Sequence, residues 1–263
     1  MIRRWIAFTS DFGLEDHYVG VVKAIIAKLG DGKISVIDIS HMVGRHNIFR
    51  GAYVSAVAAK YTPKDCVHLV VVDPSVGTGR RIVIYETDSG SVFVAPDNGV
   101  LNYAYEWFKG TAYLAEHNVI HTDATSATFH GRDVFAPLAV KLADGSDPSE
   151  FGERSATSDL VKLHVAKPEL TERECVCSVL NVDVFGNVIT NVPNGLLERD
   201  SYWLRSTKGR FPVQRKETYA QGAPGSLLLI RGSEGFYEIA LNSSSAGNLT
   251  GLEPGQKMVL EFG

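Results

Sequence analysis

The segment VHLVVVDPSVGTGR, which spans Val67–Arg80, decides the fold of the first part of this chain. Its apolar part, Val67–Val72, is uninterrupted and ends at Asp73, which is typical of a central strand buried on both faces of a sheet. The residues after it are rich in turn formers and carry the charged side chains of Asp73 and Arg80. The segment therefore predicts a buried strand with a polar loop at its carboxyl end.

Short β-branched runs and longer helical patterns alternate on both sides of this strand, which predicts a mostly parallel sheet with helices on both faces. The expected strands are Trp5–Thr9, Ser35–Ile39, Val67–Val72, Ile82–Glu86 and Ser91–Ala95. The last two flank Asp88-Ser89-Gly90, which predicts a hairpin. The expected helices are Tyr18–Leu29, Ile48–Lys60, Gly99–Phe108 and Asp133–Ala143.

The pattern changes after a charged, irregular stretch over Ser155–Glu174. We expect a boundary near Ala166–Thr171, with an N-terminal α/β domain over residues 1–165 and a C-terminal β domain over residues 172–263. Short, closely spaced strands predict that the second domain is a small β-barrel or sandwich. These strands are Val176–Val182, Asn187–Asn191, Tyr202–Leu204, Ser226–Ile230, Phe236–Leu241 and Lys257–Glu261.

Composition excludes several classes of protein. A chain of 263 residues with 44% hydrophobic residues can bury a large core, which excludes a disordered protein. Its 26 Lys and Arg against 30 Asp and Glu leave no basic excess, so no nucleic-acid partner is expected. No stretch approaches the roughly 20 apolar residues of a membrane span, so no membrane partner is expected either. The apolar start ends at Thr9-Ser10-Asp11, too early for a secretory signal.

The three cysteines are too few for a disulfide framework, and their odd number favours a reducing compartment, so a cytoplasmic location is expected. Cys175-Val176-Cys177 invites a metal-site interpretation. The alternation is also that of a strand with two small apolar residues on one face. The strand is favoured, because zinc sites usually separate their cysteines by two to four residues.

Polar clusters follow the predicted strands, and ligands of open α/β sheets bind outside the carboxyl ends of the strands. Five clusters lie in the first domain: Thr9–Gly13, Asp38–His41, Val72–Arg80, Pro96–Gly99 and His130–Asp133. A sixth, Asp183–Asn187, lies in the second domain. Taken singly, each cluster could be turn or helix-cap chemistry. Together they gather His41, Asp73, Arg80 and His130 at one end of a sheet, which predicts an active site.

Two other functions fit these residues. A metal-dependent phosphoesterase could use a cluster of carboxylates and imidazoles for divalent ions, namely Asp11, Asp16, His41, Asp73, Asp97, His130 and Asp133. Arg80 weighs against it, because a guanidinium beside Asp73 adds positive charge where a metal would already supply it. A non-catalytic module that binds an adenosine nucleoside would use the same pockets without turnover.

The ordered set of motifs resembles the S-adenosyl-L-methionine (SAM) hydroxide adenosyltransferases, hydrolases related to fluorinating and chlorinating enzymes. The motifs are SDFGLEDHYVGVVK, ISH, VVDPSVGTGRR, APDNGVL, FHGRDVFAP and DVFGNVITN, in this order. They run through both domains and cover most of the chain. The resemblance implies hydrolysis of SAM to adenosine and methionine by a water-derived hydroxide that attacks C5′ of the ribose, with no metal and no cofactor.

The resemblance also assigns site residues. Asp73, Arg80 and His130 match the family's water-orienting triad, and Asp11 matches the carboxylate that holds the ribose hydroxyls. In the second domain, Asp183 and Asn187 match residues at the methionine end, while Phe185 and the stretch Ser233–Glu238 match the adenine and methionine walls. The family's sites lie between subunits, which implies a homotrimer.

The chain departs from the family pattern at two positions. Ser75 replaces a glycine of DPGVG, which matters only if that position needs a positive φ. His46 stands where the halogenating relatives have an aromatic residue, so it is either an adenosine contact or a surface histidine. The long insertion of the fluorinating relatives is absent between Gly99 and His130, which favours hydroxide over halide.

Overall fold

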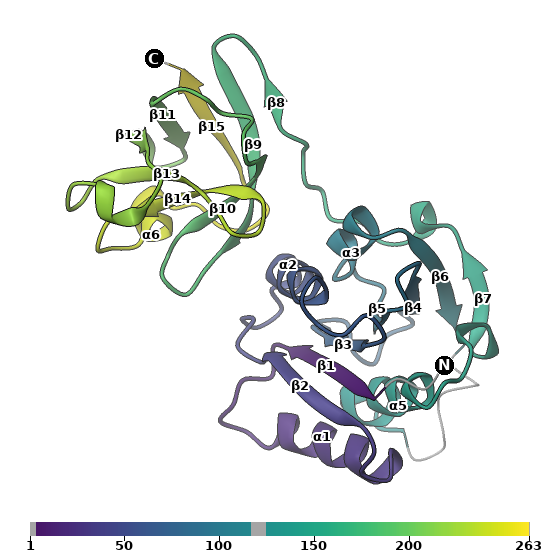
Figure 1. The fold of residues 1–263 in the computed structure, drawn as a ribbon. Coiled ribbons are helices and arrows are strands. Elements are labelled where there is room, and N and C mark those ends of the chain that lie inside the picture. The colour runs from purple at the N-terminus through teal and green to yellow at the C-terminus, as the bar shows by residue number, and fades with distance from the viewer. Residues whose placement is uncertain (1–3, 117–124, 263) are drawn as a thin grey trace. The chain divides into compact units, whose positions relative to one another are not determined.

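A computed structural model describes residues 4–116 and 125–262 of the chain (Figure 1). The chain divides between residues 163 and 164 into two compact units. Each unit has its own hydrophobic core.

The N-terminal unit is built on a seven-stranded sheet in the order β2-β1-β3-β5-β4-β6-β7. Its strands are β1 (Trp5–Ser10), β2 (Ser35–Ser40), β3 (Val67–Val71), β4 (Ile82–Thr87), β5 (Val92–Pro96), β6 (Gly110–Ala115) and β7 (Gly152–Ser155). Strand β3 is buried along its whole length, as the apolar run predicts. The segment that decides the fold therefore forms the third strand of this sheet, between β1 and the central strand β5.

Helices cover both faces of the sheet (Figure 1). They are α1 (Tyr18–Leu29), α2 (Ile48–Ala59), α3 (Asn102–Trp107) and α5 (Ala136–Ala143), which continues from a π-helical turn, η1 (Gly131–Phe135). Helices α1 and α5 pack on one face with Leu69 and Val71 of β3, and α2 and α3 lie on the other face. The α/β fold class is confirmed, with helix boundaries that shift by a few residues.

The sheet is half parallel. The pairs β1–β2, β1–β3 and β3–β5 are parallel, whereas β4–β5, β4–β6 and β6–β7 are antiparallel. The predicted hairpin of β4 and β5 is confirmed. Strands β6 and β7 were not predicted. They add the further antiparallel pairs at one edge of the sheet, and β7 has no fully buried residue that would mark it in the sequence.

The C-terminal unit is a β-barrel closed by the pairing of β10 with β9. Its seven barrel strands are β9 (Glu174–Val182), β10 (Val188–Pro193), β11 (Ser201–Ser206), β12 (Gly209–Arg215), β13 (Leu227–Arg231), β14 (Phe236–Leu241) and β15 (Lys257–Phe262). Strand β8 (Glu169–Leu170) extends β9, and α6 (Ala246–Thr250) follows β14. The unpredicted β12 completes the ring.

Cys175 and Cys177 lie in β9 with both side chains in the barrel core, as the strand interpretation predicts. The remaining short helical turns are η2 (Pro148–Glu150), η3 (Thr157–Asp159) and η4 (Tyr219–Gln221). Among the helices of residues 4–116 and 125–262, none combines the length and apolar character that crossing a membrane requires.

His68 of β3 is a buried imidazole that limits stability in acid. It stacks on Phe93 with ring centroids 4.5 Å apart, and its Nε2 shares a hydrogen bond of 3.2 Å with Thr62. Burial lowers the pKa of His68 from 6.5 to about 4. The unfolded chain therefore binds a proton that the folded chain does not bind, and the unfolding free energy falls as the pH drops from 6.5 toward 4.

We expect His68→Gln to flatten this acid dependence. Between about pH 7 and about pH 5 the native protein should lose about 2 kcal/mol of unfolding free energy through His68 alone. Over the same pH range, the unfolding free energy of His68→Gln should fall by about 2 kcal/mol less than that of the native protein. Urea unfolding at several pH values measures both. The control is His164→Gln, since that exposed imidazole is solvated in both states. Equal slopes for His68→Gln and the native protein would contradict the assignment.

Candidate functional site

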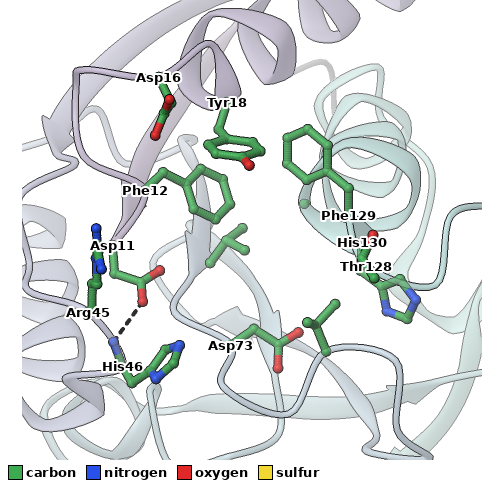
Figure 2. A pocket seen from close by; sticks show the side chains of 13 residues that line it. Asp11, Phe12, Asp16, Tyr18, Arg45, His46, Asp73, Thr128, Phe129 and His130 are labelled. Atoms are coloured by element: carbon green, nitrogen blue, oxygen red, sulfur yellow. Dashed lines mark hydrogen bonds between the residues drawn. The ribbon is translucent and has the colours of Figure 1, made fainter.

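A cavity of about 400 Å³ opens at the carboxyl ends of β1 and β3 (Figure 2). Its lining residues are Asp11, Phe12, Asp16, Tyr18, Arg45, His46, Val71, Asp73, Val76, Thr128, Phe129, His130 and Gly131. Asp11 directly follows β1, and Asp73 follows β3 after one further residue. Figure 2 shows Asp11 and His46 across the cavity from Phe129 and His130. The parallel strands thus bring distant polar loops to one edge of the sheet.

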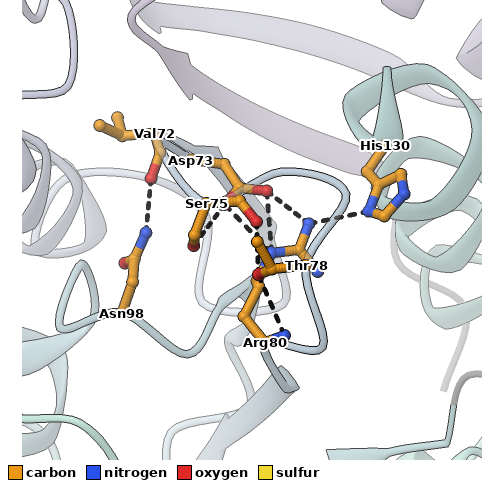
Figure 3. Close-up of polar contacts among 7 residues, drawn as sticks. All are labelled: Val72, Asp73, Ser75, Thr78, Arg80, Asn98 and His130. Carbon is orange, nitrogen blue, oxygen red and sulfur yellow. Dashed lines mark hydrogen bonds and ion pairs between the residues drawn. The ribbon is translucent and has the colours of Figure 1, made fainter. Parts of the chain in front are cut away.

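Four of the residues predicted from the sequence line this cavity: Asp11, His46, Asp73 and His130. Arg80 joins them through its contacts with two of the four, Asp73 and His130 (Figure 3). The sequence does not reveal the aromatic wall. There the ring of Phe129 lies 5.9 Å from that of Phe12 and 5.3 Å from that of Tyr18. The signal that could have found it is adjacency, because Phe12 follows Asp11 and Phe129 precedes His130.

Asp73 and Arg80 form a buried, multiply hydrogen-bonded ion pair (Figure 3). Arg80 Nε donates to both carboxylate oxygens at 3.0 and 2.9 Å, and Arg80 Nη2 donates to Oδ2. Each side chain is only 6% exposed. The guanidinium also lies 4.9 Å from the ring centre of Phe135. Pairing and hydrogen bonding are what a charge needs when it is removed from water.

His130 accepts a hydrogen bond from the same guanidinium. Arg80 Nη2 lies 3.0 Å from His130 Nδ1, and an arginine N–H can only donate. Nδ1 therefore carries a lone pair in this arrangement, and in the neutral imidazole the proton sits on Nε2. While Arg80 occupies Nδ1, His130 has no ring nitrogen with which to take a proton.

Ser75 lies in the loop between β3 and β4, next to the ion pair. Ser75 Oγ donates to Asp73 Oδ1 at 3.2 Å. The non-glycine residues that have a positive φ in the described ranges are Asp31, His46 and Ser243. Ser75 is not among them, so replacing the glycine costs no backbone strain and adds a hydrogen bond.

Arg80 Nη1 is buried and has no hydrogen-bond partner in residues 4–116 and 125–262, as expected of a group that receives a ligand or water.

Asp11 and His46 are joined on one side of the cavity. The backbone N–H of His46 donates to Asp11 Oδ2 at 2.8 Å (Figure 2). His46 adopts φ 59°, a left-handed conformation that costs energy for a residue with a side chain. Strained backbone conformations of this kind cluster at functional sites. In this conformation His46 lines the cavity.

The ISH motif forms a different network. Ser10 Oγ lies 2.8 Å from His41 Nδ1, His41 Nε2 lies 3.1 Å from Asp38 Oδ1, and Lys23 Nζ donates to Asp38 Oδ2. The arrangement of Ser10, His41 and Asp38 resembles a Ser-His-Asp catalytic triad. Ser10 is fully buried, however, and cannot reach an external substrate. His41 lines an adjoining cavity of about 470 Å³ that shares Asp11, Phe12, Asp16 and Arg45 with the first.

Guanidinium groups also hold two of the other acidic candidates. Asp97 pairs with Arg81, and Asp133 pairs with Arg132. The hydrogen bond from Arg132 is the main reason that the pKa of Asp133 lies below its usual value. No group of three His, Cys, Asp or Glu side chains that could hold a metal ion occurs in the described part of the chain. Three carboxylates of the phosphoesterase hypothesis, those of Asp73, Asp97 and Asp133, are thus paired with arginines.

The C-terminal unit has its own pocket of about 750 Å³. It is lined by Asp183, Phe185, Asn187, Tyr219, Ser233, Glu238, Leu241, Asn242, Ser243, Ser244 and Ser245. Every site residue predicted for this domain is present, and Tyr219 is a residue that the sequence did not reveal. It lies far along the chain from the DVFGN motif and belongs to no recognisable motif of its own.

The DVFGN turn is held by its own first residue. Asp183 Oδ1 accepts the backbone N–H groups of Phe185 and Asn187 at 2.9 and 2.8 Å, and Oδ2 accepts Asn187 Nδ2 at 3.0 Å. Gly186 has φ 84°, and a Cβ there would lie 2.2 Å from Ser245 Oγ, so only glycine fits. The turn leaves the Phe185 ring 77% exposed at the pocket.

Two family models match the chain, one in each unit. The SAM hydroxide adenosyltransferase N-terminal domain matches residues 6–152, and the SAM hydroxide adenosyltransferase C-terminal domain matches residues 177–259. The chain belongs to the SAM hydroxide adenosyltransferase family. The resemblance inferred from the six motifs is confirmed.

Relatives match the chain over nearly its whole length. A Salinispora tropica protein named (R)-S-adenosyl-L-methionine hydrolase is 38% identical over 262 residues, which cover 98% of each chain. A Thermus thermophilus protein of the same name is 37% identical over 98% of this chain and 99% of its own. A crystal structure of an uncharacterized conserved protein from Thermotoga maritima, 33% identical, matches with a TM-score of 0.87 over 97% of this chain and 99% of that one.

In this family member, the surroundings of Glu238 disfavour the charged form of its carboxylate. Burial, aided by the nearby charges of Asp183 and Glu234, raises the pKa of Glu238, although a hydrogen bond from Tyr219 lowers it. Tyr219 Oη donates to Glu238 Oε2 at 3.1 Å, and burial together with Glu238 raises the pKa of Tyr219 to about 12. Tyr219 therefore stays a donor at neutral pH.

We expect Glu238→Gln to stabilise the protein at neutral pH. A raised folded-state pKa means that Glu238 supports folding at low pH and loses this contribution as the pH rises through the folded pKa. The variant, which cannot ionise, should match the native Tm near pH 4.5 and exceed it near about pH 7.5. Thermal unfolding at both pH values measures the difference, with the exposed Glu172→Gln as control. A variant that is less stable at the higher pH would refute the argument.

Proposed function

We propose that this protein hydrolyses SAM to adenosine and L-methionine. The observation that carries the proposal is the buried Asp73–Arg80–His130 network at the cavity that Asp11 also lines, in a chain of the SAM hydroxide adenosyltransferase family. Relatives named (R)-S-adenosyl-L-methionine hydrolase support it over nearly the full length. No observation favours the phosphoesterase or the non-catalytic binding module.

The chemistry asks little of the protein beyond positioning. Water attacks C5′ of the ribose, the C5′–O bond forms, and the C5′–S bond breaks. The bonding electron pair stays on sulfur, which becomes the neutral thioether of methionine, while the water loses one proton. Because a sulfonium is already a good leaving group, no general acid is needed. The site must hold the water in line with the C5′–S bond and accept its proton.

Asp73 is the proton acceptor in this proposal. His130 is occupied at Nδ1 by Arg80 and protonated at Nε2, so the imidazole cannot serve as the base in this arrangement. Three donor groups reach the Asp73 carboxylate, from Arg80 Nε, Arg80 Nη2 and Ser75 Oγ. Arg80 Nε shares its one hydrogen between the two oxygens, so a water in the cavity that Asp73 lines can take the place of one end of this shared contact. Arg80 fixes the carboxylate, and His130 fixes Arg80.

The two pockets support the substrate-binding roles that the family resemblance assigns. Asp11 holds the ribose hydroxyls, since one carboxylate can accept two hydrogen bonds, and His46 contacts the adenosine beside it. Asp183 and Asn187 hold the methionine end. The walls around adenine and methionine come from Phe185, Ser233 and Glu238. The carboxylates of the C-terminal pocket favour a substrate with an ammonium and a sulfonium charge.

Assembly and location complete the proposal. We propose a homotrimer in which neighbouring chains build each site, supported by the exposed apolar side chains of Val184 and Phe185, which are 82% and 77% exposed beside the C-terminal pocket. We also propose a cytoplasmic location, supported by three buried, unpaired cysteines.

Hydrolysis in ¹⁸O-labelled water tests the reaction itself. We expect purified protein to release adenosine and methionine from SAM in equal amounts, with the label in the 5′-hydroxyl of adenosine. Chromatography with mass spectrometry measures both products. Release of adenine, or label in methionine alone, would show a different bond cleavage. Binding of SAM without products would identify a binding module.

The Asp73–Arg80–His130 network predicts how substitutions within it change kcat and KM. We expect Asp73→Asn, Arg80→Ala and His130→Ala each to lower kcat, with Asp73→Asn losing about 10²- to 10⁴-fold, while KM for SAM changes little. Double variants should be hardly worse than the worse single variant, because the three side chains act as a unit. Asp200→Asn, which changes an aspartate paired with Arg215 in the other unit, is the control. Losses that multiply in the doubles would mean that each residue contacts the substrate independently.

A further inference from the structure

The APDNG motif lies where it can hold both ends of the Asp73–Arg80 loop. In the sheet, β5 lies between β3 and β4, so the loop that joins β3 to β4 must cross the carboxyl end of β5. Asp97 and Asn98 are the first two residues after β5. They therefore emerge between the two stems of the loop, the end of β3 on one side and the start of β4 on the other.

Asn98 holds the first stem (Figure 3). Its Nδ2 donates to the backbone carbonyl of Val72 at 2.8 Å, and Val72 directly precedes Asp73. Its Oδ1 accepts the backbone N–H of Val100 at 3.1 Å, so the amide is anchored at both ends and its orientation is determined. A turn residue needs only the second of these bonds.

Asp97 holds the second stem. Its carboxylate pairs with Arg81, which directly follows Arg80, and its backbone N–H donates to the Arg81 carbonyl at 3.0 Å. The Asp97 side chain is 1% exposed, and Oδ1 also accepts the backbone N–H of Val161 at 2.9 Å. The backbone hydrogen bond and the ion pair together limit the positions that Arg81 can take.

We propose that Asp97 and Asn98 are positioning residues for the reaction, acting as a clasp on the loop that carries Asp73 and Arg80. This inference rests on the proposed function, because it assigns a consequence to the place of Asp73. The loop contains Gly77 and Gly79, whose backbone freedom would otherwise spread the Asp73 carboxylate over several positions. A displacement of about 1 Å at a reacting group can cost about 10²-fold in rate.

Asn98→Asp is the central test. It keeps the size of the side chain and the acceptor for Val100, but it replaces the donor to Val72 by an oxygen that repels that carbonyl. We expect kcat for SAM hydrolysis to fall about 10- to 100-fold and KM to stay within about twofold. A general loss of structure would instead change KM and Tm together with kcat. An unchanged kcat in folded Asn98→Asp would overturn the proposal.

Asn191→Asp is the matched control in the barrel. Asn191 makes the same pair of bonds, with Nδ2 donating to the Ala166 carbonyl at 2.7 Å and Oδ1 accepting the Ser178 N–H at 2.8 Å. Both asparagines are half-buried. The control should lower Tm comparably and leave kcat unchanged. If Asn191→Asp lowers kcat as much, the effect of Asn98→Asp is not positional and the proposal falls.

The double variant Asp73→Asn/Asn98→Asp asks whether the clasp acts through Asp73. If it does, the second substitution should cost almost nothing once the carboxylate is gone. Losses that multiply would show that Asn98 works by another route and would overturn the assignment. Asn98→Ser, which removes the donor without adding a repelling oxygen, gives the same comparisons if Asn98→Asp does not fold.

Hydrogen exchange separates failure of the clasp from failure of the proposed function. Amides of residues 75–80 should exchange faster in Asn98→Asp than in the native protein and in Asn191→Asp, whatever the enzyme's substrate. Unchanged exchange there would refute the clasp even if SAM is hydrolysed. Faster exchange in a protein that does not hydrolyse SAM would sustain the clasp as a structural element and refute the function assigned to Asp73.

Discussion

Asp73 and Arg80 are opposite charges that are each 6% exposed, and moving two such groups out of water costs several kcal/mol per ion unless geometry and hydrogen bonds compensate. Much of the N-terminal unit supplies that compensation. Arg80 makes its bonds to both carboxylate oxygens, Ser75 adds a hydroxyl, and Phe135 offers the face of its ring to the guanidinium. The sheet supplies the rest, since β5 emerges between the two stems of the loop that carries the pair.

The same ion pair determines what the other side chains can do. Once the guanidinium donates to Asp73, its Nη2 can also reach His130 Nδ1, and the histidine becomes a support for the arginine. In the proposed reaction, His130 therefore does not act as the base, and the Asp73 carboxylate takes that role. A metal ion at this place would compete with a guanidinium that is already bound, which is why acidic residues near one another do not by themselves indicate a metal centre.

The C-terminal pocket shows the cost of a charged binding surface. Asp183 is satisfied by its own turn, whereas Glu238 shares a half-buried space with other carboxylates and a single tyrosine donor. A core built only for stability would not keep such a group. In the proposed function this pocket holds the ammonium and sulfonium charges of SAM, which favours negative charge there at a cost in the stability of the unliganded protein.

The sequence by itself determined the local features. The apolar run of β3, the glycine-rich loop after it, and the polar residues at the strand ends depend on neighbours in the chain, and a period of two or an uninterrupted run marks them directly. From these, the fold class, the main strands and the cavity residues Asp11, Asp73 and His130 could be predicted. The DVFGN turn is equally local, because Asp183 holds it through bonds within five residues.

Only the tertiary structure decided the features that depend on long-range pairing. Strand β7 exists because its backbone pairs with β6, and backbone hydrogen bonds leave no side-chain pattern to recognise. The protonation of His130 depends on an arginine 50 residues away, and the role of Asn98 depends on the order β3-β5-β4, which places a turn beside residues 26 positions earlier. A sequence specifies which groups are present. Which of them meet is decided by the order of strands in the sheet, because that order sets the distances on which hydrogen bonds and charge pairs depend.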